Sequence, residues 1–175
     1  MLQMLKNANA AKVQVSSLTT AQKNAALKAM AAALLTNEET ILAANREDLI
    51  HATGISAVML DRLALNSARI KGMAQGILDV VKLPDPVGRL LEEHTRADGL
   101  LIRKISVPMG VIAIIYESRP NVTSDAAALA LKSGSACVLR GGKEAFRSAN
   151  AIVNALRKGL ISQGITENAV NLVQD

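Results

Sequence analysis

The chain has 175 residues, half of them apolar and a fifth charged, which is typical of one globular domain and not of a disordered or fibrous protein. It holds 29 alanines, no Trp, one Tyr and one Phe, which argues against an aromatic platform for stacking nucleic-acid bases or sugars. The net charge of +5 favours anionic partners: nucleic acid, phosphorylated metabolites or a nucleotide.

Residues 1 to about 82 are predicted to be helical, and the motif Pro84-Asp85-Pro86 marks a boundary after them. Thr19 and Gln22 have the spacing of a capping box at the start of a helix. We expect the apolar face of that helix to be buried: Leu27, Met30, Ala31 and Leu34. Three further residues are predicted N-caps of later helices: Asn37, Ser56 and Asn66.

Residues 87–107 are predicted to form a β-hairpin whose turn ends in Asp98-Gly99. Such a hairpin offers one sheet edge to a partner. It is therefore a candidate oligomer contact.

From residue 108 onward, apolar runs alternate with helical patterns. Val111–Tyr116 is an apolar run without alternation, which is typical of a strand buried on both faces of a parallel sheet. A helix is predicted over 124–132, a second strand over 136–139, a helix over 144–162 and a third strand over 169–173. The long helix should bury one face: Phe146, Ala149, Val153, Leu156 and Leu160. This order predicts an α/β fold: a helical segment, a hairpin, and part of a doubly wound, Rossmann-like parallel sheet.

Two loops follow strand ends, where open parallel sheets bind their ligands. The first, Arg140-Gly141-Gly142-Lys143, places two cations and two glycines before a helix whose N-terminal amides would be unpaired. Since basic residues stand where NAD-binding sheets carry an acid, the best match is the 2′-phosphate of NADP(H). The alternative is a glycine turn with solvated charges. The loop is not a Walker P-loop, because no Ser or Thr follows the lysine.

The second loop covers residues 117–123, after the first strand of the parallel sheet. Arg119 is a candidate partner for a carboxylate or phosphate, and the amide of Asn121 is a candidate donor to a developing oxyanion. The alternative is that Asn121, Thr123 or Ser124 only caps the next helix.

The remaining chemistry-bearing residues point to structural roles. Cys137, the single cysteine, lies inside a predicted buried strand and should be inert. His51 and His94 are far apart in the sequence, so no metal site is expected. The longest apolar run covers residues 29–35, too short to cross a bilayer, and no signal-peptide core precedes it. We therefore expect a cytoplasmic protein with no membrane partner.

Several segments closely resemble one family. They are Met59–Leu65, Leu83–Gly88, Val107–Ile112, Ile115–Thr123, Leu131–Ala136 and Val138–Ala145. The strings Tyr-Glu-Ser-Arg-Pro-Asn and Leu-Arg-Gly-Gly-Lys-Glu are the most specific of them. The chain resembles the gamma-glutamyl phosphate reductases, also called glutamate-5-semialdehyde dehydrogenases, of the aldehyde dehydrogenase superfamily.

The resemblance implies NADPH-dependent reduction of L-glutamate 5-phosphate to L-glutamate 5-semialdehyde with release of phosphate, a step of proline biosynthesis. It also implies a homo-oligomer and a functional association with glutamate 5-kinase. By the same resemblance, the cofactor is bound by Arg140, Gly141, Gly142 and Lys143. Arg119 then binds the phosphate or carboxylate of the substrate, and Asn121 corresponds to the superfamily asparagine that helps to hold the oxyanion.

The resemblance also implies a division of the chain. Residues 1–86 would be the N-terminal helical part of the cofactor-binding domain, 87–107 the hairpin, and 108–175 the βαβαβ part of that domain. The match corresponds to less than half of a full-length member, and Cys137 does not match the nucleophilic cysteine of the family. We therefore expect negligible reductase activity from this chain alone.

Two other functions stay open at this point. One is a non-catalytic nucleotide-binding or interaction module of the same fold. The other is a nucleic-acid binder that acts through its positive charge, with a steep salt dependence. We expect no nucleic-acid partner, because no basic run in the sequence is longer than two residues.

Overall fold

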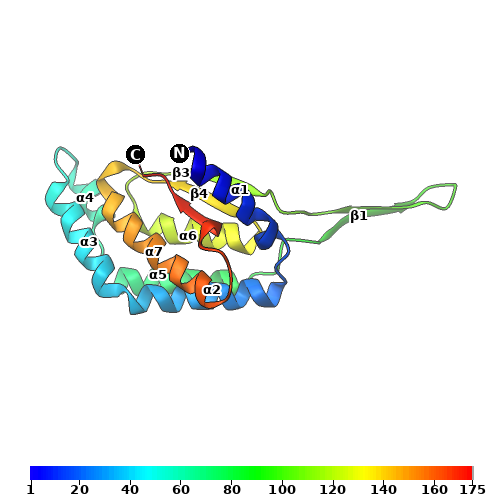
Figure 1. Ribbon diagram of the computed structural model, residues 1–175, viewed down its shortest axis with the longest axis horizontal. Coiled ribbons are helices and arrows are strands. Elements are labelled where there is room, and N and C mark those ends of the chain that lie inside the picture. The colour runs from blue at the N-terminus through cyan, green and yellow to red at the C-terminus, as the bar shows by residue number, and fades with distance from the viewer. Residues whose placement is uncertain (175) are drawn as a thin grey trace.

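The computed structural model describes residues 1–174, which form helices, one hairpin and one parallel sheet (Figure 1). The helical part comprises α1 (Leu2–Ser16), α2 (Thr20–Thr36), α3 (Glu38–His51), α4 (Ala57–Leu63) and α5 (Ser67–Lys82). The hairpin strands are β1 (Leu90–Thr95) and β2 (Leu101–Ile105). The remaining elements are β3 (Val111–Ile115), α6 (Pro120–Lys132), β4 (Ala136–Arg140), α7 (Phe146–Ser162) and β5 (Val170–Leu172), with 3-10 turns at Lys143–Ala145 and Glu167–Ala169. The predicted α/β architecture is confirmed.

The parallel sheet has the strand order β3-β4-β5. Val111 pairs with Ala136 across the first two strands, and Cys137 pairs with Val170 across the last two. The crossover helices α6 and α7 pack on one face of the sheet, and α1 lies across the other (Figure 1). Helices α2 and α5 form a further layer on the outer side of α6 and α7. Helices thus cover both faces of the sheet, as in a doubly wound fold.

Strand β3 differs from its prediction. It lies at an edge of the sheet, Ala113 is exposed, and Ile115 is 80% exposed. The buried strands are β4, which is covered at every position except Arg140, and β5, which is covered at all three positions. An apolar run predicts a strand, but it does not distinguish an edge strand from a central one.

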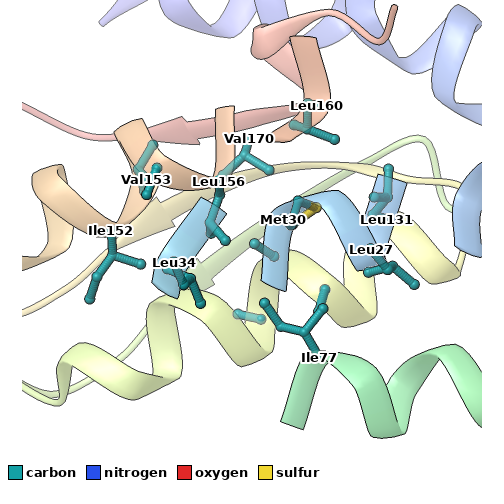
Figure 2. Close-up of a cluster of buried hydrophobic side chains, with 14 of the residues drawn as sticks. Leu27, Met30, Leu34, Ile77, Leu131, Ile152, Val153, Leu156, Leu160 and Val170 are labelled. Carbon is teal, nitrogen blue, oxygen red and sulfur yellow. The ribbon is translucent and has the colours of Figure 1, made fainter. Parts of the chain in front are cut away.

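One hydrophobic core joins the helical layer to the sheet. Figure 2 shows the side chains that meet there: Leu27, Met30, Leu34, Ile77, Leu131, Ile152, Val153, Leu156, Leu160 and Val170. The predicted buried positions of α2 are all part of this core, as are those of α7 except Phe146. The N-terminal helices and the parallel sheet therefore share one interior.

Most of the predicted helix starts form as expected. Three predicted caps make their hydrogen bonds: the capping box of Thr19 and Gln22, and the single caps Ser56 and Asn66. Asn37 occupies the N-cap position of α3, but its side chain makes no capping hydrogen bond there. Its amide instead donates to the Ala33 carbonyl, and its oxygen accepts from Lys158, so that it links α2 to α7.

A buried ion pair holds the segment that leads into the hairpin. Lys23 is 1% exposed and places Nζ 2.9 and 3.0 Å from the two carboxylate oxygens of Asp85. The Thr20 hydroxyl and the Val87 amide donate to the same carboxylate. Burial raises the pKa of Asp85, but these hydrogen bonds and the Lys23 charge outweigh it, so the net pKa is lowered. Asp85 thereby ties the base of the hairpin to the first turn of α2.

Helix α7 crosses α2 at a glycine. A Cβ atom on Gly159 would lie 2.7 Å from the backbone nitrogen and Cα of Met30, and 2.8 Å from the carbonyl carbon of Ala29. Backbone atoms of a packed helix cannot move aside as the end of a flexible side chain can. Only glycine therefore allows the two helices to approach this closely.

We expect Gly159→Ala to lower the free energy of unfolding by at least about 2 kcal/mol, because the added methyl group meets the α2 backbone. Urea unfolding followed by far-UV circular dichroism measures the change. Asn154→Ala, at an exposed position of the same helix, is the matched control and should shift stability by less than about 0.5 kcal/mol. Equal stabilities of the two variants would contradict the close crossing.

Asp85→Asn should lower the free energy of unfolding by about 3 kcal/mol, because it leaves the buried Lys23 charge without a counter-ion. The lowered pKa of Asp85 means that its stabilising effect is present above the ordinary pKa and is lost as the pH falls through the folded-state pKa. The difference between the two proteins should therefore shrink in acid. Asp79→Asn removes an exposed partner of Lys82 and should leave stability near wild type. A pH-independent difference would contradict the role of the carboxylate charge.

Candidate functional site

The two loops singled out from the sequence lie together at the carboxyl edge of the sheet. The Tyr116 amide donates to the Arg140 carbonyl over 3.0 Å, which joins the loop after β3 to the end of β4. The Ser118 hydroxyl donates to the Glu144 carboxylate, and this hydrogen bond is the main cause that lowers the pKa of Glu144. The loops therefore form one continuous structure.

A cavity of about 570 Å³ opens at the ends of β4 and β5, and we call it the β4–α7 cavity. The four residues predicted to bind the cofactor all line it: Arg140, Gly141, Gly142 and Lys143. Arg140 and Lys143 are exposed and take part in none of the ion pairs among residues 1–174. Their charges are thus directed to solvent or to a bound anion.

The two glycines of this loop are explained by the neighbouring loop. A Cβ atom on Gly142 would lie 3.0 Å from the Ser118 backbone nitrogen, and one on Gly141 would lie 3.1 Å from the Tyr116 ring. Neither glycine has a positive φ. Their packing shows that the glycines let the two loops meet, and their proposed role in letting a ligand approach the backbone stays a prediction.

The N-terminus of α7 is already occupied by a carboxylate of the protein. Asp48 of α3 is buried and accepts hydrogen bonds from the amides of Arg147 and Ser148, at 3.1 and 2.7 Å. The Ser148 hydroxyl donates to the same carboxylate over 2.6 Å. The expectation that this helix offers unpaired amides to an anion is therefore wrong for these two amides. The exposed side-chain cations remain as the candidate anion-binding groups of the cavity.

Two residues that line the cavity were not predicted as site residues from the sequence. Phe146 was predicted to be buried because it lies three residues before Ala149, but it is 36% exposed and lines the β4–α7 cavity. Arg147 follows it in the same cavity wall. The burial of Phe146 was predicted wrongly because a 3-10 turn over residues 143–145 precedes α7, so the helix begins at Phe146 rather than at Glu144.

A second cavity, of about 420 Å³, lies beside the loop after β3, and we call it the α5–α6 cavity. Both residues predicted from that loop line it. Arg119 occupies the N-cap position of α6 and places Nε 3.2 Å from Oε2 of Glu117. Asn121 is exposed in the first turn of α6, with its Nδ2 atom 3.5 Å from Oδ2 of Asp125.

The alternative reading of this loop, helix capping by Asn121, Thr123 or Ser124, is wrong. Helix α6 already begins at Pro120, whose fixed φ suits the first helical position. The Thr123 hydroxyl lies 2.8 Å from the Tyr116 hydroxyl, and the Ser124 hydroxyl donates back to the Asn121 carbonyl. Capping therefore does not account for the Asn121 side chain, and its role toward an oxyanion stays a prediction.

The remaining chemistry-bearing residues lie apart from the cavities. Cys137 is buried in β4, as predicted, and burial raises the pKa of its thiol to about 12, which favours an inert residue. His51 and His94 are exposed on α3 and β1. Within residues 1–174, no group of three or more His, Cys, Asp or Glu side chains has a metal-binding arrangement. Across the same residues, no helix has the length and apolar character needed to cross a membrane.

Comparison with known proteins finds close homologues of this chain. No model of a protein family matches the chain. The gamma-glutamyl phosphate reductase of Streptococcus suis is 59% identical over 165 residues, which cover 94% of this chain and 40% of that protein. The crystal structure of gamma-glutamyl phosphate reductase from Thermotoga maritima matches with a TM-score of 0.96 at 42% identity, over 99% of this chain and 42% of that one.

More distant structures share the fold alone. A probable aldehyde dehydrogenase from Listeria monocytogenes matches with a TM-score of 0.73 at 17% identity, over 98% of this chain and 35% of that one. The chain spans about 40% of the length of the curated relatives it matches. Over nearly all of its residues, the chain is therefore homologous to the N-terminal part of the gamma-glutamyl phosphate reductases, which confirms the family resemblance of its motifs.

Proposed function

We propose that this chain forms the NADP(H)-binding part of a reductase that converts L-glutamate 5-phosphate to L-glutamate 5-semialdehyde with release of phosphate. The reaction would belong to proline biosynthesis and take place in the cytoplasm. The observation that carries the proposal is the pair of exposed cations, Arg140 and Lys143, at the β4–α7 cavity. The names of the homologous reductases support the same reaction.

The β4–α7 cavity fits a nucleotide that carries an extra phosphate. Its volume of about 570 Å³ is in the range of ligand sites. Among residues 1–174, the lining of the cavity includes three cations and no carboxylate, whereas a site for NAD places an acid on the ribose hydroxyls. Arg140 and Lys143 would hold the 2′-phosphate through charge-assisted hydrogen bonds. Phe146 and Leu172 supply apolar surface for the adenine.

The α5–α6 cavity would receive the substrate. Arg119 is proposed to bind its phosphate or carboxylate, and Asn121 to donate to the oxyanion that develops on the reacting carbonyl. Arg119, in the loop at residues 116–119, lines this cavity. The same loop is hydrogen-bonded through the Tyr116 amide to Arg140, which lines the β4–α7 cavity. When bound, NADPH would supply the hydride.

The reaction also needs a thiolate that displaces phosphate from the acyl phosphate. Cys137 is unsuited to this role because it is buried and its pKa is raised to about 12. We therefore propose that the nucleophile comes from residues outside these 175, and that this chain alone has negligible reductase activity.

The hairpin is proposed to bind a second copy of the chain. Strands β1 and β2 project from the body of the molecule, and every residue of both strands is exposed (Figure 1). Their exposed apolar side chains are Leu90, Leu91, Leu101, Ile102 and Ile105. A two-stranded hairpin is only marginally stable alone in water, so a partner surface is needed. An association with glutamate 5-kinase, which would supply the acyl phosphate, is proposed on the family resemblance.

The cofactor preference tests the proposal directly. NADPH should bind this chain at least about tenfold more tightly than NADH, because only NADPH carries the phosphate that pairs with Arg140 and Lys143. Titration followed by nucleotide fluorescence measures both affinities, since the single Tyr gives a weak protein signal. Lys143→Ala should weaken NADPH binding and leave NADH binding nearly unchanged.

Lys104→Ala is the matched control, because it removes the same charge from an exposed position on the hairpin. It should leave the affinities for both nucleotides unchanged. Equal affinities of the wild-type chain for NADPH and NADH would reject the proposed 2′-phosphate site. If Lys143→Ala lost affinity for NADPH and NADH equally, the proposed 2′-phosphate site would also be contradicted.

Cys137 should react very slowly with iodoacetamide at pH 8 in the native chain, because burial keeps the thiol protonated and covered. Unfolding in guanidinium chloride should raise the labelling rate at least about a hundredfold, toward that of a free thiol. Mass spectrometry after timed quenching measures both rates. Fast labelling of the native chain would reopen Cys137 as a nucleophile.

A further inference from the structure

The α5–α6 cavity brings together charges of both signs. Arg62, Arg69 and Arg119 line it with guanidinium groups, and Asp61 and Asp125 line it with carboxylates. These residues come from α4, α5, the loop after β3 and α6. Some of these charges are paired within the protein, and others are not.

Arg69 and Asp61 satisfy each other. Nη2 of Arg69 lies 2.9 Å from Oδ1 of Asp61, and Nη1 of Arg69 donates to the carbonyls of Asp61 and Ala64. With these bonds, Arg69 fixes the end of α4 to the start of α5. This pair therefore builds one wall of the cavity.

Arg62 and Arg119 have only a weak partner in common. Oε2 of Glu117 lies 3.7 Å from Nη1 of Arg62 and 3.2 Å from Nε of Arg119, and the Glu117 side chain is 72% exposed. Such exposed ion pairs contribute little to stability. Nε of Arg119 is itself buried, and within residues 1–174 it makes no aligned hydrogen bond. An anion in the cavity would give both guanidinium groups a better partner.

Asp125 is a half-buried carboxylate without a cation. It takes part in none of the ion pairs formed among residues 1–174. Its side-chain hydrogen bond from Asn121 is 3.5 Å long, at the limit for such a bond. Burial raises the pKa of Asp125 more than this bond lowers it. A cationic group in the cavity would therefore be bound favourably by its carboxylate.

Gly72 leaves open space in the wall of the same cavity. It lies within α5, where glycine is less stabilising than alanine. No heavy atom lies within 4 Å of the position that its Cβ would take, and its φ is not positive. Neither packing nor backbone conformation therefore requires glycine at this position. A ligand that occupies the space beside Gly72 would account for the glycine.

We propose that the α5–α6 cavity recognises the amino-acid end of the substrate, with the Asp125 carboxylate on the α-ammonium group and Arg62 and Arg119 on the α-carboxylate. The inference rests on the proposed function, and it assigns the carboxylate rather than the phosphate to Arg119. A site for phosphate alone would not place an unpaired carboxylate in its wall, because the two negative charges repel. An amino acid carries its ammonium group and its α-carboxylate on the same carbon atom, so it matches the charges of both signs in the cavity.

The test uses L-glutamate as the probe, with the 175-residue chain and NMR titration. Two matched compounds each remove one charge: glutarate lacks the ammonium group, and 4-aminobutyrate lacks the α-carboxylate. L-glutamate should bind saturably, and each of the other two should bind at least about tenfold more weakly. Asp125→Asn should abolish the preference over glutarate, and Arg62→Gln should abolish the preference over 4-aminobutyrate.

Gly72→Ala separates a binding role from a structural one. It should raise the Tm, because alanine favours the helix, and weaken L-glutamate binding about tenfold. A merely structural glycine would not combine a gain in stability with a loss of binding. Arg89→Gln removes a positive charge at an exposed residue that does not line this cavity, and it should leave the affinity for L-glutamate unchanged.

The proposal is overturned if the wild-type chain binds L-glutamate and glutarate equally, if Asp125→Asn keeps the preference, or if no saturable binding occurs. The NADPH titration keeps this outcome separate from the proposed cofactor role. Asp125→Asn and Gly72→Ala should bind NADPH as the wild type does. Loss of the NADPH preference with intact selectivity for L-glutamate would reject the cofactor proposal and leave the amino-acid site standing.

Discussion

The close crossing of α7 over α2 at Gly159 fixes the helix that follows the loop of residues 140–143. Because residue 159 has no side chain, α7 packs against the backbone of Met30, and the leucines of both helices fill one core. Asp48 of α3 also fixes the first turn of α7, because its carboxylate accepts hydrogen bonds from two backbone amides of that turn. The loop with Arg140 and Lys143 stands between β4 and this twice-fixed helix. The N-terminal helices thus position the candidate site, although they contribute no residue to the β4–α7 cavity.

The charges of the chain divide into those that hold the fold and those that face a cavity. Asp85 neutralises Lys23, and Asp48 caps α7, so each of these buried charges has a partner inside the protein. A buried charge without a partner is costly, and removal of Asp85 would leave Lys23 as such a charge. Removal of Asp48 would leave two amides of α7 without their acceptor. Arg140 and Lys143 lie at a cavity and, within residues 1–174, form no ion pair. The contrast in pairing is the physical basis for reading these two cations as ligand-binding groups.

Local sequence patterns predicted much of the fold, but they did not predict contacts between segments that are distant in the sequence. The capping box at Thr19 and the turn at Gly99, which has a φ of +86°, depend on neighbouring residues, and both form as predicted. Asp48 acts on a helix about a hundred residues further along, so no local pattern could identify it as a cap. The predicted loops did contain the six residues proposed for the site. Arg62, Gly72 and Asp125 were not found, because they lie on three helices whose faces meet only in the folded chain.

The loop at residues 116–119 connects structural elements that line the two cavities. Tyr116 bonds to the end of β4 through its amide and to α6 through its hydroxyl, and Ser118 bonds to Glu144. A side chain on Gly142 would meet the backbone of this loop at Ser118, so the loop would have to shift. Arg119, which follows Ser118 and lines the α5–α6 cavity, would then be displaced as well. The twin glycines therefore affect both candidate sites, because they let one hydrogen-bonded loop pack against the end of β4 while it holds Arg119 at the second cavity.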